Sequence, residues 1–246
     1  MVDINKLLKT IHFTYRKTLG KNINLLIVGG SVGRKNFVHG WSDIDVLLVL
    51  NKIDSLNLRL VKKCEQELES LAKIEIDTMI VSKYTIEHTE PRKLHGKIKN
   101  FLFFLGKTKV LIKKNIKIPA MSYQDFIYGF WATLADQDKN FLRRNADIFT
   151  HTKDKKSLQK LLKKNIKIIF LILKQSLAEP QLAPSTYREV IYLAEKSLPI
   201  RIIKQLKKYE EMRAKKEVTI ISEEKLRAEI DLSVKIFNDI TKLLFI

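Results

Sequence analysis

Two aspartates at alternate positions, Asp43 and Asp45, lie where an apolar strand is expected to begin. Side chains at positions i and i+2 of a strand point to the same face, so the two carboxylates should lie side by side. Carboxylates this close repel each other unless a cation lies between them. Mg²⁺ suits such a pair, because it binds one or two carboxylates and completes its octahedral shell with water and substrate phosphates. The pair therefore predicts a magnesium site.

A turn of small residues precedes the aspartates by about a dozen positions. Gly29, Gly30 and Ser31 follow the apolar run of residues 25–28, which has the length of a buried strand. Glycines let a phosphate chain approach the backbone, and a serine hydroxyl can donate a hydrogen bond to it. Arg34 is close enough in sequence to reach the same phosphates. Gly30, Ser31 and Arg34 are therefore predicted to bind a nucleoside triphosphate, and ATP is the expected one.

The Gly-Ser turn at residues 30–31 and the Asp-x-Asp run at residues 43–45 together resemble the signature of the DNA polymerase beta-like nucleotidyltransferase superfamily. That family pairs the two motifs at this spacing, each beside an apolar strand. The resemblance implies a third carboxylate on a neighbouring strand, which binds the catalytic metal and receives the proton of the acceptor. Asp77 fits that position better than Glu75, which lies nearer the start of the strand expected over residues 74–81.

Apolar periodicity predicts the elements that position these residues. Helices are expected from Asp3 to about Gly20 and from Ser55 to about Ala72, and strands over residues 25–28, 46–50, 74–81 and 108–112. A strand, a crossover helix and a second strand make a small mixed sheet. Residues 1–118 are therefore predicted to form an α+β nucleotidyltransferase catalytic domain.

After Pro119 every apolar pattern is helical. Helices are expected to begin at Ser122, Lys155, Pro184, Pro199 and Ser222. About five helices of this kind predict an all-α bundle over residues 119–246. The bundle resembles, in architecture alone, the helical domain that many nucleotidyltransferases append to hold the acceptor.

The chain has 246 residues and a net charge of +19, from 46 Lys and Arg against 27 Asp and Glu. Such an excess favours polyanionic partners. Residues 91–124 and 155–178 contain no Asp or Glu, and the second stretch carries a basic stripe at helical spacing, formed by Lys156, Lys160, Lys163 and Lys167. The stripe is predicted to bind RNA. The alternative is a solvated surface of the kind found in lysine-rich proteomes.

Together these residues predict nucleotidyl transfer, an in-line displacement at the α-phosphorus that is typical of two-metal sites. One Mg²⁺ is assigned to Asp43 and Asp45 with the triphosphate, and a second to the same pair with Asp77. RNA, such as tRNA, is the expected acceptor. The alternatives are a small molecule of the aminoglycoside type, a protein in a toxin–antitoxin system, or nucleotide binding without catalysis. Polycationic aminoglycosides would be attracted poorly by so basic a protein.

The cysteine content and the lengths of the apolar runs exclude some classes of protein. Cys64 is the single cysteine, which excludes an internal disulfide, and its place in a helical pattern predicts a buried thiol. No apolar run approaches membrane-spanning length, and no signal-peptide pattern precedes the first expected helix. We therefore expect a cytoplasmic protein without a membrane partner.

Overall fold

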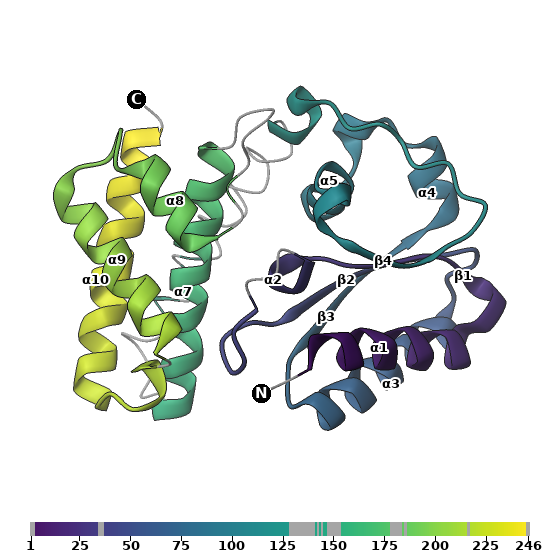
Figure 1. Cartoon of the computed structure of the whole chain (residues 1–246), viewed down its shortest axis with the longest axis horizontal. Coiled ribbons are helices and arrows are strands. Elements are labelled where there is room, and N and C mark those ends of the chain that lie inside the picture. The colour runs from purple at the N-terminus through teal and green to yellow at the C-terminus, as the bar shows by residue number, and fades with distance from the viewer. Residues whose placement is uncertain are drawn as a thin grey trace. The chain divides into compact units, whose positions relative to one another are not determined.

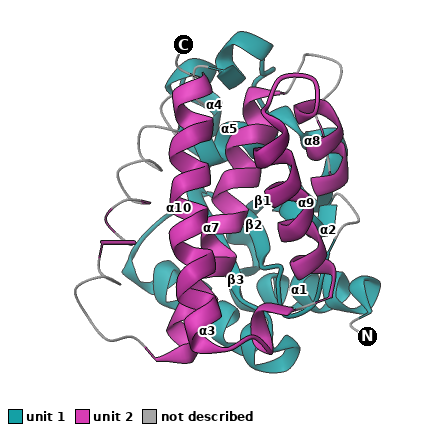
Figure 2. Ribbon diagram, turned by 90° about the vertical axis from the view of Figure 1, so that its left-hand side faces the viewer, with its two compact units in different colours: residues 1–130 teal, residues 131–246 magenta. Residues whose placement is uncertain are grey.

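The structure, a computed structural model, describes residues 3–33, 37–127, 154–177, 186–215 and 217–244, together with residues 141, 143, 145, 146 and 184. The chain divides into two compact units, Met1–Phe130 and Trp131–Ile246 (Figures 1 and 2). The first unit extends beyond the boundary at residue 118 expected from the sequence. Phe126 belongs to it, because its ring stacks on that of Phe103 with the centroids 4.4 Å apart.

A four-stranded sheet forms the centre of the first unit. Its strands are β1 (Ile23–Val28), β2 (Ile44–Leu50), β3 (Ile76–Ser82) and β4 (Lys109–Lys113). They lie in the order β3-β2-β1-β4, with β1 antiparallel to β2 and β4, and β2 parallel to β3. The sheet is therefore mixed, as expected. A parallel pair needs a crossover connection, which the helix α3 (Ser55–Ala72) provides.

Helices cover both faces of this sheet (Figure 1). The helix α1 (Ile4–Leu19) and α3 pack against one set of strand side chains, which includes Leu26. The helices α4 (Lys83–His88) and α5 (Gly96–Phe103) pack against the other set, which includes Leu47. Successive side chains of a strand alternate between faces, so strands buried on both sides read as continuous apolar runs.

Side-chain caps begin the first two long helices where the sequence indicates. Asp3 Oδ1 accepts hydrogen bonds from the backbone N–H groups of Asn5 (2.9 Å) and Lys6 (3.1 Å). Asp54 Oδ1 accepts one from the N–H of Asn57 (2.9 Å). Each carboxylate pairs with N–H groups that the first turn of a helix leaves without an intrahelical partner. The predictions of α1 and α3 are confirmed.

The described part of the second unit is helical. It contains α7 (Lys155–Ser176), α8 (Tyr187–Ala194), α9 (Ile200–Ala214) and α10 (Glu223–Leu244). Asn165 is buried in α7, and its Nδ2 donates to Asn145 Oδ1 and to Ser233 Oγ of α10, each at 2.8 Å. The start predicted for α8 at Pro184 is wrong, because Thr186 forms a capping box with Glu189 and the helix begins at Tyr187.

The described residues also form four short 3₁₀ segments, at Gly20–Asn22, Pro91–Lys93, Leu105–Lys107 and Glu217–Thr219. None of the helices in the described ranges is long and apolar enough to cross a lipid bilayer. Cys64 is buried in α3 as predicted, and burial raises the pKa of its thiol.

Candidate active site

The turn after β1 lies directly against the second aspartate. Gly29 N donates to the backbone oxygen of Asp45 (2.9 Å), and the short helix α2 (Gly30–Gly33) follows. Gly30 has a φ of 60°, and a Cβ built on it would lie 2.1 Å from Asp45 Oδ2. Both the backbone conformation and the space therefore require glycine at this position. The carboxylate of Asp45 reaches the backbone of the Gly-Ser turn, as a shared phosphate and metal site requires.

Ser31 contributes a buried hydroxyl to the same turn. Within the described part of the chain, its Oγ is buried and has no hydrogen-bond partner. A buried hydroxyl without a partner costs about 1–3 kcal/mol, so such groups usually mark a ligand or a water site. A phosphate oxygen held at this turn would accept a hydrogen bond from it. Arg34, the third residue predicted to bind the triphosphate, lies outside the described residues.

The loop before β2 is closed by its own hydrogen bonds. Ser42 Oγ accepts a hydrogen bond from Val38 N (3.0 Å), and Ser42 N donates to Val38 O (2.8 Å). Trp41, in the same loop, is only 4% exposed. The chain therefore enters β2 from an anchored turn, and Asp43, one residue before the strand, is half-buried at its start.

The parallel pairing of β2 with β3 brings the second and third predicted carboxylates together. Asp45 is paired with Asp77 in the register, so the two side chains lie on the same face of the sheet. Thr78 points to the opposite face, where its hydroxyl shares a hydrogen bond of 2.7 Å with the Tyr15 hydroxyl. Glu75 precedes β3, and its backbone oxygen accepts a hydrogen bond from Ile44 N (2.9 Å).

A lysine lies between the two paired carboxylates. Lys97 Nζ is 2.5 Å from Asp77 Oδ2 and 3.6 Å from Asp45 Oδ1. Lys97 is in the first turn of α5, where the neighbouring Ile98 packs into the core beneath the sheet. No sequence pattern distinguishes Lys97, because its stretch contains many lysines and only the packing of α5 directs this one to the aspartates.

The oxygen ligands of this face fit a divalent cation. Asp45 and Asp77 already share one positive charge, that of Lys97, and carboxylate oxygens are the ligands that Mg²⁺ prefers. Within the described ranges, no three His, Cys, Asp or Glu side chains converge as a ready-made metal cluster. Asp45 and Asp77 therefore share one cationic group, the Lys97 ammonium. Asp43 does not converge with these two carboxylates on one point.

The predicted basic stripe lies on α7 in the second unit. Lys156 and Lys160 are exposed, whereas Lys163 and Lys167 are half-buried. Burial lowers the pKa of the Lys163 ammonium, and the nearby charge of Lys167 lowers it further. Two of the four lysines thus lie close together, an arrangement that an anion would stabilise.

Part of the sequence matches a known protein family. The sequence model of a family described as "Nucleotidyltransferase domain" matches residues 10–104. No curated protein matches the sequence. Among solved structures, spectinomycin adenyltransferase AAD(9) from Enterococcus faecalis, crystallised with ATP and spectinomycin, is similar in fold, with a TM-score of 0.61 and 11% identity over 96% of this chain and 100% of that one.

A second solved structure, a mutant of the toxin–antitoxin pair MntA–HpeT, has a TM-score of 0.30 and 15% identity over 61% of this chain and 98% of that one. The family match spans the Gly-Ser turn, both motif aspartates and β3. Residues 10–104 therefore match a nucleotidyltransferase domain, and a helical C-terminal region follows them in the chain.

Proposed function

We propose that the chain transfers a nucleoside monophosphate from Mg²⁺-ATP to an acceptor hydroxyl. The observation that carries the proposal is the register of β2 and β3, which pairs Asp45 with Asp77 beside the Gly-Ser turn. Asp43 and Asp45 would hold one Mg²⁺ with the triphosphate, and Asp77 with the same pair would hold a second. When bound, the two ions neutralise the charge that develops on the attacking and leaving oxygens.

The Gly-Ser turn would bind the phosphates, and Asp77 would act on the acceptor. The Gly30 N–H and the Ser31 hydroxyl would donate to β- and γ-phosphate oxygens, since glycine lets the phosphates approach the backbone. The acceptor oxygen forms a bond to the α-phosphorus while the bond to the bridging β-phosphate oxygen breaks, and pyrophosphate leaves with the electron pair. Asp77 would receive the proton of the acceptor hydroxyl. Its side chain is 56% exposed, against 28% for Asp45, so an acceptor can approach it from solvent.

RNA is the acceptor that the charge of the protein favours. The net charge of +19 attracts polyanions and repels polycationic small molecules. Lys156 and Lys160 are exposed on α7, and the stripe that ends at Lys167 covers about 16 Å at a rise of 1.5 Å per residue. That length follows several phosphates of an RNA backbone.

A small polar molecule is the second candidate acceptor. The observation that favours it is the likeness in fold, over 96% of this chain, to an adenyltransferase crystallised with ATP and spectinomycin. This is an analogy of fold, because folds host different substrates on different sites.

One labelling experiment tests both the reaction and the acceptor. The protein is incubated with Mg²⁺ and each NTP labelled at the α-phosphate, together with total RNA, total protein or a panel of aminoglycosides. We expect label from ATP in RNA, and none with the Asp43→Asn/Asp45→Asn variant, which should fold as well as wild type because the carboxylate repulsion is removed.

The matched control, Glu224→Gln/Asp231→Asn on α10, removes two carboxylates from the helical unit and should transfer label as wild type does. Wild-type transfer by the Asp43→Asn/Asp45→Asn variant would refute the assigned site. Label in aminoglycosides alone would replace RNA by the small-molecule acceptor.

A further inference from the structure

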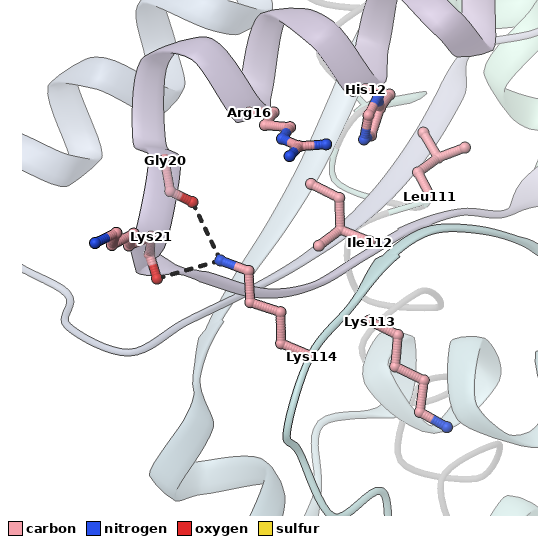
Figure 3. Close-up of a pocket in the computed structure, with 8 residues that line it drawn as sticks. All are labelled: His12, Arg16, Gly20, Lys21, Leu111, Ile112, Lys113 and Lys114. Carbon is pink, nitrogen blue, oxygen red and sulfur yellow. Dashed lines mark hydrogen bonds between the residues drawn. The ribbon is translucent and has the colours of Figure 1, made fainter.

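A basic pocket lies between α1 and β4 in the first unit (Figure 3). It has a volume of about 470 Å³, within the range of roughly 300–1,000 Å³ that is typical of small-molecule sites. Its cationic lining comes from both sides: Arg16 and Lys21 from α1 and the segment that follows it, and Lys113 and Lys114 from the end of β4. None of the described residues that line it is acidic.

The pocket is separate from the carboxylates of the active site. Lys113 is paired with Leu25 near the start of β1, whereas the Gly-Ser turn follows the other end of that strand. Lys109, paired with Val28 beside the turn, is four residues away, or about 13 Å along β4. Ile112 packs on the α1 side of the sheet, while the paired aspartates lie on the face covered by α5. A ligand in this pocket would therefore not be the nucleotide bound at Asp45.

The charge of the pocket comes from two segments without acids. Residues 4–21 and 107–117 contain no Asp or Glu, and the fold places the two segments side by side. Lys114 Nζ donates to the backbone oxygens of Gly20 and Lys21, each at 3.4 Å (Figure 3). Lys114 thus covers carbonyl groups that would otherwise present partial negative charge at the end of α1. The field within the pocket is therefore positive.

The side chains of the pocket suit a phosphate ester that carries an apolar group. Arg16 points across the pocket toward Ile112 and Lys114, Lys21 extends outward at its rim, and the side chain of Lys113 extends from the other side of β4, away from Arg16 (Figure 3). A guanidinium binds phosphate oxygens in pairs through its planar fork, and a rim lysine adds flexible counter-charge. Leu111 and Ile112 are only half-buried and offer an apolar surface for a base or a sugar.

We propose that this pocket binds a phosphate-bearing nucleotide unit at a second site, distinct from the substrate nucleotide. The unit is either a free nucleotide or a nucleotide within an RNA chain, since both present the same phosphate, sugar and base. Binding here needs neither Mg²⁺ nor the aspartates. Binding in this pocket can therefore be tested independently of the proposed transfer reaction.

Binding measured in EDTA separates this pocket from the metal-dependent site. Without divalent ions the carboxylates of the active site repel phosphates, whereas the pocket offers only positive charge. Calorimetry with ADP and fluorescence anisotropy with a labelled ten-nucleotide RNA, each over a salt series, are the two arms. The test variant is Arg16→Gln/Lys21→Gln/Lys113→Gln, which leaves Lys114 in place. The matched control, Lys63→Gln/Lys204→Gln/Lys225→Gln, removes three exposed charges on α3, α9 and α10.

We expect the pocket variant to bind at least one of the two ligands with an affinity lower by about ten-fold or more, and the control variant to bind both ligands with wild-type affinity. For RNA, the slope of log affinity against log salt should fall by about two, since each lost phosphate contact contributes about 0.7. Loss of ADP binding identifies a free-nucleotide site, and a changed slope without ADP binding identifies an RNA contact.

Equal effects of the two triple variants, or no binding of either ligand by wild type, would overturn the proposal. Circular dichroism checks that the pocket variant is folded. The single substitution Arg16→Gln, at an exposed position, provides the same test with less perturbation.

Discussion

Replacing Gly30 by alanine is expected to slow nucleotidyl transfer by about 100-fold while the protein stays folded. The new Cβ would lie 2.1 Å from Asp45 Oδ2, and real Cβ contacts essentially never fall below 3.0 Å, so the carboxylate must retreat by about 1 Å. Mg²⁺ requires ligand distances of about 2.0–2.1 Å in a near-ideal octahedron. A misplacement of about 1 Å costs on the order of 100-fold in rate. The positive φ of 60° adds about 1–2 kcal/mol to the cost of folding.

The assay separates these two effects. Transfer kinetics give kcat/KM, calorimetry gives the affinity for Mg²⁺-ATP, and urea unfolding gives the free energy of unfolding. Gly20→Ala is the matched control, because Gly20 also has a positive φ, 54°, but a Cβ there would meet nothing within 4 Å. We expect both variants to lose similar stability and only Gly30→Ala to lose activity.

Two results would refute this reasoning. If Gly30→Ala keeps transfer close to the wild-type rate, the contact between the turn and Asp45 is not needed for the reaction. If Gly20→Ala loses as much activity as Gly30→Ala, the loss reflects backbone strain, and the displaced carboxylate is not its cause.

Three further predictions concern the same unit. Asp77→Asn should abolish transfer while largely sparing Mg²⁺-ATP binding, and Glu75→Gln should be mild; the opposite ranking in transfer assays would move the role to Glu75. Lys97→Met should tighten Mg²⁺ binding in calorimetry, because the ion no longer competes with an ammonium 2.5 Å from Asp77, and weaker binding would contradict that competition. Burial raises the pKa of the Tyr15 hydroxyl, so the folded state retains a proton that the unfolded state releases above about pH 10. Stability should therefore fall by about 1 kcal/mol between pH 10 and 11 from this residue, and Tyr15→Phe should flatten that fall in urea titrations; equal slopes would exclude the effect.

Local chemistry was sufficient to predict most elements of the first unit. Capping carboxylates at Asp3 and Asp54, and continuous apolar runs in the central strands, depend only on neighbours in the sequence. The helix α5 was not predicted, because its eight residues follow a basic stretch and it is stabilised by packing under the sheet. Burial of Ile98 and Phe101 in that tertiary contact outweighs the weak local pattern.

The candidate site was predictable in composition and not in pairing. Alternation along a strand puts Glu75 and Asp77 on the same face, so both satisfy the requirement for a third carboxylate. Only the register between β2 and β3 places Asp77 opposite Asp45, and register depends on the whole packed sheet. The contact of Lys97 with Asp45 and Asp77 is likewise long-range, so no local pattern indicates it.

The parallel pairing of β2 with β3 also determines when the site forms during folding. The antiparallel β1–β2 pair joins segments near in sequence, whereas Asp45 meets Asp77 only after α3 has closed the crossover. Loop closure costs conformational entropy before the pairing contributes stability, so we expect it to follow the local pair. Trp41, buried in the loop that leads into β2, should recover its native fluorescence first, and Mg²⁺-dependent activity should return later with the docking of β3. Regain of activity is thus a measure of completed sheet assembly, which collapse alone does not achieve.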